Sequence, residues 1–289
     1  MNVRPRRSVL YMPAGATRAV EKARSLPCDV VILDLEDAVA PDAKTEARDL
    51  AVAAVQAGGF GGREVVIRVN GRDTPWGAQD LAAAVAAQPD AVLVPKVSTP
   101  EDVAAYEAGL WGRPRLWAMI ETCASIFRLD AIAGAAASQR LEAWVIGTND
   151  LAKEMRCRPG VLRAPLAGPL SLAVAAARAH GLAVIDGVYN DIGDAEGLAR
   201  QCAQGADFGF DGKSLIHPSQ IEAANAAFSP APDDIAWART IVEAFNLPEN
   251  GAKGVVRVEG RMVERLHLAE ARRLIAVAEA IAGHETNDP

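Results

Sequence analysis

Short apolar runs rich in Val, Ile and Leu recur along the chain and are separated by longer Ala-rich stretches. The runs are continuously apolar, which is typical of parallel strands that are covered on both faces. They predict eight strands: Ser8–Met12, Val30–Leu35, Glu64–Val69, Ala91–Val97, Arg115–Ile120, Ala143–Ile146, Ala183–Asp186 and Phe208–Phe210.

Helical patterns fill the intervals between these strands. They cover Thr17–Ser25, Ala43–Gln56, Ala78–Ala87, Pro100–Ala108, Ile126–Ala136, Pro169–His180 and Glu196–Gly205. Strands that recur at a spacing of about 30 residues, with helices between them, match the (β/α)8 repeat. The sequence therefore predicts an α/β fold, a (β/α)8 TIM barrel over residues 1–228. A doubly wound open sheet is the alternative.

Residues 229–289 form a predicted C-terminal helical extension. Asp233–Phe245 is expected to be a helix, Val255–Glu259 a short strand and Met262–Ile281 a long amphipathic helix. We expect this extension to pack on the barrel or on a neighbouring subunit.

The composition excludes several classes of protein. Half of the 289 residues are hydrophobic, enough for a large core, and the formal net charge of −7 argues against nucleic acid as a partner. No apolar stretch approaches the roughly 20 residues that a membrane-spanning helix needs, so no membrane partner is expected. The run Ser8–Met12 is too short for a secretory signal. The four cysteines form no CxxC pair, and we expect reduced thiols in a cytoplasmic protein.

Carboxylates follow several of the predicted strands. Asp34, Glu36 and Asp37 follow the second strand, Glu121 follows the fifth and Asp150 follows the sixth. In a (β/α)8 barrel the catalytic groups lie at the carboxyl ends of the strands. Acids gathered beside apolar strands are costly unless a cation or a catalytic role holds them there. The pattern therefore indicates a divalent-metal site in the mouth of a barrel.

Other polar residues at predicted strand ends are Tyr11, Lys96, Asp186 and Lys213. Each has a structural alternative when it is considered singly. Lys96 is equally consistent with an ion pair, and Asp186 with a cap on the following loop.

Glu121 and Asp150 are the best candidates for metal ligands, because an apolar strand directly before each one would hold it rigidly. Two carboxylates together with water and substrate oxygens suit Mg²⁺. Zinc is not expected, because the four histidines are scattered. Asp37 is expected either to hold water beside the metal or to cap the helix near Ala43.

Three cationic or titratable residues are candidates for binding anions. Arg68 ends the third strand and would bind a carboxylate or a thioester oxygen that becomes anionic; a salt bridge to the acids is the alternative. Lys22 lies one turn from Arg18 and either meets a phosphate or belongs to a solvated helix face. His217 begins the last barrel helix, where it either faces an anion or caps the helix.

Several motifs in their order along the chain resemble the citrate lyase β-subunit-like family of the HpcH/HpaI aldolase/citrate lyase superfamily. They are RSVLYMPA, DLEDAVAPDAK, IRVN, VPK, the Glu of MIET, GTNDL and FDGKSLIHPSQI. The resemblance implies a (β/α)8 barrel, a homotrimer or hexamer, and Mg²⁺ as cofactor. It also implies a carbon–carbon bond made or cleaved between a CoA thioester and a keto acid such as glyoxylate, pyruvate or oxaloacetate.

The resemblance also assigns roles to individual residues. The metal ligands would be Glu121 and Asp150, with Arg68 as the substrate arginine and Asp37 as the acid beside the metal. The contacts to CoA would come from Tyr11, Lys22, Ile216 and His217, and the keto-acid carboxylate would lie at the backbone of Asn149 and Asp150.

Glu264 is a departure from the family. Lyases of the family often carry an Asp at this place, contributed to a neighbour's active site, whereas this chain reads EGRMVER. The extra methylene moves the carboxyl group and would alter proton delivery. The segment resembles the malyl-CoA thioesterase branch.

Taken with the acids at the strand ends, the resemblance implies an Mg²⁺-dependent lyase that cleaves a malyl-CoA or citramalyl-CoA type of substrate, with Glu264 protonating the enolate of acetyl-CoA. The alternatives are a (3S)-malyl-CoA thioesterase using the same site and a citrate lyase β subunit acting on a carrier-protein thioester.

Overall fold

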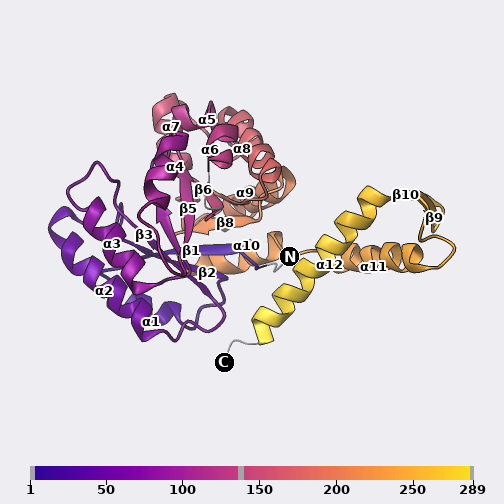
Figure 1. Cartoon of the computed structure of the whole chain (residues 1–289), viewed down its shortest axis with the longest axis horizontal. Helices are drawn as coiled ribbons and strands as arrows, with labels where there is room; N and C mark the ends of the chain where they lie inside the picture. Colours follow the sequence, from indigo (N-terminus) through magenta and orange to yellow (C-terminus); the bar gives the residue numbers. More distant parts are fainter. Residues whose placement is uncertain (1–3, 136–139, 287–289) are drawn as a thin grey trace. The chain divides into compact units, whose positions relative to one another are not determined.

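Eight parallel strands close into a barrel in a computed structural model that describes residues 4–135 and 140–286 (Figure 1). Each strand pairs with the next, and the barrel closes where Ser8 in β1 pairs with Lys213 in β8. The predicted (β/α)8 fold is confirmed. The strands are β1 Ser8–Pro13, β2 Val30–Asp34, β3 Glu64–Arg68, β4 Ala91–Val94, β5 Arg115–Ile120, β6 Leu141–Ile146, β7 Ala183–Asp186 and β8 Gly212–Leu215.

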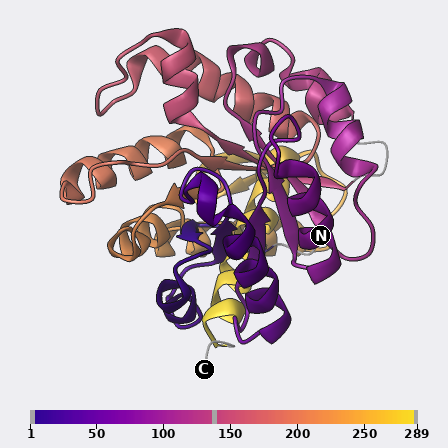
Figure 2. The ribbon, with the colours of Figure 1, turned by 90° about the vertical axis from the view of Figure 1, so that its left-hand side faces the viewer.

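Helices surround these strands (Figure 2). They are α1 Thr17–Ala23, α2 Lys44–Ala57, α3 Gly77–Ala87, α4 Pro100–Glu107, α5 Cys123–Ile126, α6 Leu129–Gly134, α7 Thr148–Met155, α8 Ala167–Ala179, α9 Ala195–Phe208 and α10 Ile221–Ala227. Short 3-10 turns at Pro41–Ala43, Ala164–Leu166 and Pro218–Gln220 precede α2, α8 and α10.

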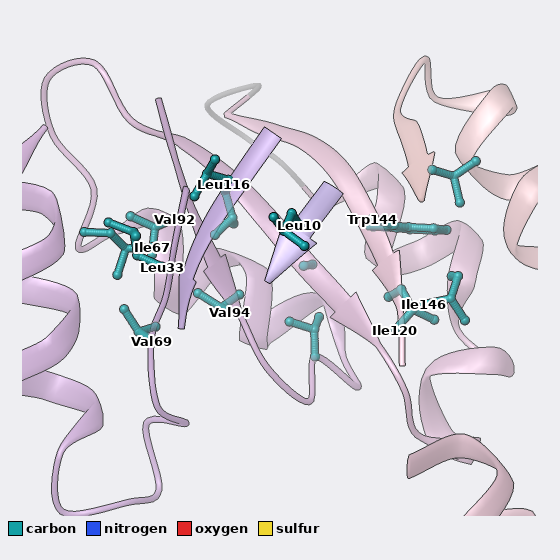
Figure 3. Packing of buried hydrophobic residues seen from close by; sticks show 14 of the residues in the cluster. Leu10, Leu33, Ile67, Val69, Val92, Val94, Leu116, Ile120, Trp144 and Ile146 are labelled. Carbon is teal, nitrogen blue, oxygen red and sulfur yellow. The ribbon is translucent and has the colours of Figure 1, made fainter. Parts of the chain in front are cut away.

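Successive residues of strands β1 to β7 belong to two different apolar cores. One core cluster consists of strand residues alone, including Ile32, Val66 and Met119, and therefore fills the barrel interior. The other joins strand residues such as Leu33 and Ile67 to apolar residues of the helices (Figure 3). Burial on both faces is why the strands read as continuous apolar runs.

This alternation decides which strand-end side chains face the barrel axis. Tyr11, Arg68 and Glu121 continue the inward series at spacings of two residues. Asp186 and Lys213 instead continue the outward series, two residues from Val184 and Leu215. The alternation of side chains along each strand thus separates polar residues that the sequence analysis had placed together in the barrel mouth.

The predicted eighth strand at Phe208–Phe210 is wrong. Phe208 ends α9, and Gly209 follows in the left-handed conformation at φ 91°. The real strand β8 contains Lys213 and Ser214, which are buried polar residues. An apolar pattern cannot detect a strand whose buried lysine is compensated by tertiary ion pairing.

The helix predicted over Ile126–Ala136 is two helices, α5 and α6, and Ala136 lies outside the described residues. The sequence also missed α7 altogether. This eight-residue helix buries Thr148, Leu151 and Ala152. It is too short to have a clear period, and tertiary packing stabilises it.

Residues 6–228 and 229–286 belong to different compact units. The second unit contains α11 Pro232–Asn246, the hairpin β9 Val255–Val258 and β10 Arg261–Glu264, and α12 Arg265–Thr286 around its own apolar core. The helix predicted from Met262 therefore begins later. Glu259 and Gly260 have φ values of 46° and 83°, which form a two-residue turn and pair the next residues as a strand.

None of the described helices is long and apolar enough to cross a membrane.

Candidate active site

A cavity of about 270 Å³ lies at the carboxyl ends of the barrel strands. Its wall contains seven of the residues that the sequence selected: Tyr11, Asp37, Arg68, Glu121, Asn149, Asp150 and Ile216. Asp34, Met119, Val188, Asn190 and Ser214 also line it. The structure therefore brings the predicted carboxylates and the predicted arginine into one space.

Arg68 is held in this wall by carboxylates of the β2 loop. Its Nε and Nη2 donate to the two oxygens of Asp34, each at 2.6 Å, and Nη1 lies 2.7 Å from Glu36. The guanidinium lies over the ring of Tyr11, 4.8 Å from its centroid. Burial by itself lowers the pKa of Arg68, but the surrounding Tyr11 and Asp34 raise it well above its usual value. The salt-bridge alternative is therefore observed, and Arg68 is a permanent cation in the cavity wall.

Glu121 is 2% exposed and is fixed by backbone contacts. Its Oε1 accepts a hydrogen bond of 2.8 Å from the backbone N–H of Lys96, which has a left-handed φ of 54°. Its side chain packs against Gly147, where any Cβ would overlap with it. Burial, and then the nearby charge of Glu36, raise the pKa of Glu121 to about 7.

Glu36 is a site residue that the sequence did not single out from its acid cluster. Burial raises its pKa to about 7, and the neighbouring carboxylates of Asp37 and Asp34 contribute to the rise. Its charge acts on Glu121, as does that of Asp150. Carboxylates that repel one another in a buried space favour a divalent cation between them.

The donor set fits Mg²⁺. Carboxylate oxygens are its preferred protein ligands, and it usually keeps several water or substrate ligands. Within residues 4–135 and 140–286, no three His, Cys, Asp or Glu side chains form a complete metal-binding group. Two carboxylates such as those of Glu121 and Asp150 would leave coordination positions of Mg²⁺ for water or substrate oxygens.

Asp150 reaches the cavity from a helix and not directly from a strand. It lies in the first turn of α7, one residue after Asn149, and is half-buried. The amide side chain of Asn149 exchanges two hydrogen bonds with that of Asn190, at 2.8 and 3.2 Å. Asn190 lies in a loop after β7, and no sequence motif marked it.

Two predicted site residues of the barrel unit, Lys22 and His217, do not line the cavity. Lys22 is exposed on α1. Glu264 ends β10 in the other unit. His217 caps the turn before α10, because its Nδ1 accepts from the backbone N–H of Ser219 at 3.2 Å. The capping alternative for Asp37 is wrong, because α2 begins without a side-chain cap.

Asp186 and Lys213 also lie away from the cavity, which corrects their placement among the mouth residues. Both are fully buried on the outward side of their strands, and Lys213 Nζ lies 3.0 Å from Asp186 Oδ2. A second hollow of about 390 Å³ lies between α3 and α4, and the residues that line it include no carboxylate.

Comparisons with known proteins place this geometry in context. Residues 7–218 match the family described as HpcH/HpaI aldolase/citrate lyase. The chain is 49% identical over 278 residues to a (3S)-malyl-CoA thioesterase of Cereibacter sphaeroides, covering 96% of both chains. It is 31% identical over 294 residues to the mitochondrial citramalyl-CoA lyase of Homo sapiens, covering 96% of this chain and 86% of the lyase.

A solved structure is similar over nearly the whole chain. It is CitE from Mycobacterium tuberculosis in complex with magnesium, acetoacetate and coenzyme A. The TM-score is 0.76 and the identity 29%, over 96% of this chain and 100% of the other.

Proposed function

The chain belongs to the HpcH/HpaI aldolase/citrate lyase family, and on this premise we propose that it is an Mg²⁺-dependent enzyme that hydrolyses (3S)-malyl-CoA. The observation that carries the proposal is the 49% identity, over 96% of both chains, with a (3S)-malyl-CoA thioesterase. The size of the cavity is consistent with this substrate. Its volume of about 270 Å³ is slightly below that of a site for a drug-sized ligand. It suits a short acyl group, with CoA extending outside.

Glu121 and Asp150 are the proposed ligands of Mg²⁺. When bound, the cation would polarise substrate oxygens and hold the acid end of the acyl group. The backbone N–H groups of Asn149 and Asp150, at the start of α7, would bind the substrate carboxylate. Asp37 is 68% exposed and lies 3.2 Å from Arg68 Nη1, where it would hold water at the rim of the cavity.

Arg68 is the proposed electrostatic catalyst. In hydrolysis, water attacks the thioester carbonyl, an oxyanion forms, and the C–S bond then breaks to give malate and CoA. The positive charge of Arg68 would stabilise the oxyanion, a contribution on the order of 3 kcal/mol for one well-placed donor. Glu264 of a neighbouring subunit would position the attacking water.

Cleavage of the carbon–carbon bond is the second candidate, and the 31% identity with a citramalyl-CoA lyase favours it. Loss of the hydroxyl proton would form the keto group of glyoxylate or pyruvate and leave the enolate of acetyl-CoA. Arg68 would stabilise that enolate, and Glu264 would protonate its carbon.

One assay separates these reactions. The purified protein is incubated with Mg²⁺ and (3S)-malyl-CoA or (3S)-citramalyl-CoA, and the products are identified. Free malate and CoA support the thioesterase, whereas glyoxylate or pyruvate with acetyl-CoA supports the lyase. Turnover of the free CoA esters argues against a subunit that needs a carrier protein. Glu121→Ala and Asp150→Ala should each abolish turnover, and full activity of either variant would reject the metal assignment.

The remaining parts of the proposal concern CoA and assembly. Tyr11, Lys22, Ile216 and His217 are proposed contacts for CoA, and calorimetry with CoA tests them. A homotrimer or hexamer in the cytoplasm is proposed, since all four cysteines are free thiols and the extension exposes Met262 and Leu266. Light scattering measures the subunit number.

A further inference from the structure

A buried charge cluster lies on the outward side of β7 and β8. Two cationic side chains, Arg163 and Lys213, share the carboxylate of Asp186. Asp186 and Lys213 are fully buried, and Arg163 is 3% exposed, with its Nη2 lacking a hydrogen-bond partner among the described residues. Apolar side chains of similar volume usually stabilise a fold at least as well as a buried ion pair. Stability alone therefore does not explain the cluster.

The cluster fixes the backbone immediately after β7. Asp186 Oδ1 accepts the backbone N–H of Gly187 at 2.8 Å and the guanidinium Nη1 of Arg163 at 2.6 Å. Lys213 Nζ donates to Asp186 Oδ2 at 3.0 Å and to the carbonyl of Gly187 at 2.5 Å. Both polar groups of Gly187 are thus held by charged partners.

Gly187 in turn contacts the segment that begins α7. A Cβ at Gly187 would overlap with the side chain of Thr148 and the carbonyl of Ile146. Thr148 is the first residue of α7, and Asn149 and Asp150, which line the cavity, follow it. The first turn of α7 therefore packs directly against the backbone of Gly187.

Arg163 reaches the cluster from the segment that follows α7. Its Nε donates to Gln204 Oε1 in α9 at 2.9 Å, and Gln204 Nε2 donates to the carbonyl of Leu162 at 2.5 Å. Arg163 itself has a left-handed φ of 48°. The cluster therefore attaches both ends of the segment from Thr148 to Arg163 to the barrel.

We propose that Arg163, Asp186 and Lys213 position the first turn of α7, and with it Asp150, for binding a divalent cation. The inference rests on the proposed function, because it takes Asp150 as a metal ligand. None of the three residues lines the cavity, so they are positioning residues. Partners that orient metal ligands typically change metal affinity by about 10–100-fold when they are removed.

The test is a titration of the metal-free full chain with Mn²⁺, followed by electron paramagnetic resonance. Arg163→Leu should raise the dissociation constant for Mn²⁺ about tenfold, and Arg163→Lys should recover part of the loss. Arg178→Leu is the control, because it removes the 2.8 Å pair of Arg178 with Asp211, and the hydrogen bonds of Arg178 go to Leu182, Gly209 and Asp211, none of which belongs to α7. Its affinity for Mn²⁺ should equal that of the parent.

An unchanged affinity in folded Arg163→Leu overturns the inference. If that variant does not fold, Gln204→Ala carries the test, since it removes the hydrogen bonds to Arg163 and Leu162. About fivefold weaker binding is then expected, and parent-like binding overturns the inference. Asp150→Ala separates the two proposals. Retained Mn²⁺ binding there rejects the metal site itself, whereas loss there with unchanged binding in Arg163→Leu rejects only the positioning role.

Discussion

Arg68 and Glu121 place their polar groups in the cavity wall although they are only 5% and 2% exposed. Each keeps its position through a specific hydrogen-bond partner. Asp34 binds both Nε and Nη2 of Arg68, and the backbone N–H of Lys96 binds Glu121. These contacts leave Nη1 of Arg68 directed at Glu36 and Asp37, whose carboxylates belong to the same loop.

We predict that Asp34→Asn lowers kcat/KM about 100-fold, because Arg68 loses the bidentate partner that orients it. The matched control is Asp29→Asn, which breaks a similar buried pair with Arg7 at the opposite end of β2. Both variants should lose about 3–5 kcal/mol of unfolding free energy. Only Asp34→Asn should lose activity in steady-state kinetics; equal kinetic losses would contradict the role of Arg68.

Glu121 should also make the stability of the metal-free protein depend on pH. Its pKa is raised from 4.5 to about 7 in the folded chain. Because the folded chain binds this proton more tightly than the unfolded chain, the protonated carboxyl group contributes to the free energy of unfolding. This contribution is complete below pH 4.5 and is lost as the pH rises through 7. The unfolding free energy of the parent, measured relative to Glu121→Gln, should therefore fall by on the order of 3 kcal/mol across this interval.

Denaturant titrations in EDTA at several pH values measure this difference. Mg²⁺ added at pH 8 should then raise the melting temperature of the parent more than that of Glu121→Gln. A pH-independent difference between the two proteins would rule out the burial effect.

At the scale of secondary-structure elements, the junction between β6 and α7 determines where Asp150 and Glu121 meet. Gly147 links the two elements, and its φ of −86° is accessible to any residue. Its lack of a Cβ is required for a different reason, namely the close contact with the side chain of Glu121. The short helix α7 then begins with three cavity residues, Thr148, Asn149 and Asp150, in its first turn.

Gly147→Ala should lower turnover at least tenfold, because the added methyl group displaces Glu121 or α7. Gly168→Ala in α8 is the control, since a Cβ there meets no atom within 4 Å and Ala favours helices. Kinetic measurements on both variants check the prediction, and parent-like activity of Gly147→Ala would contradict it.

For the whole molecule, each of the two units has an apolar core of its own. The barrel unit contains the entire cavity, whereas Glu264 belongs to the other unit. If the enzyme is an oligomer with shared sites, the second unit supplies Glu264 to a neighbour. Activity would then require assembly.

Mixing of inactive subunits tests this arrangement. Glu121→Ala and Glu264→Ala should each be nearly inactive alone. After the subunits are mixed and exchanged, hybrid oligomers should regain part of the activity, because one site then contains both intact residues. Mixing Glu121→Ala with Asp150→Ala is the control, since both changes lie in the same barrel mouth. No recovery in the first mixture would place Glu264 outside the neighbour's site.

The sequence predicted the barrel because parallel strands that are buried on both faces consist of continuous apolar residues. The predicted bounds of β1 to β7 lie close to the observed ones. It missed β8 because this strand buries a charged residue, Lys213. The ion pair of Lys213 with Asp186, a distant residue, compensates for that burial. It also missed Asn190, which belongs to no motif, and it did not distinguish Glu36 from the other acids that follow the second strand. Their significance depends on neighbours that are distant along the chain.

The amino-acid order by itself determined the fold class, the family and the positions of the acids after their strands. These are local properties, because hydrophobic periodicity and motif spacing depend on residues that are close together along the chain. Only the tertiary structure decided which of those polar groups face one space. Strand parity directs Arg68 and Glu121 inward and Asp186 and Lys213 outward, since neighbouring side chains on a strand point to opposite faces.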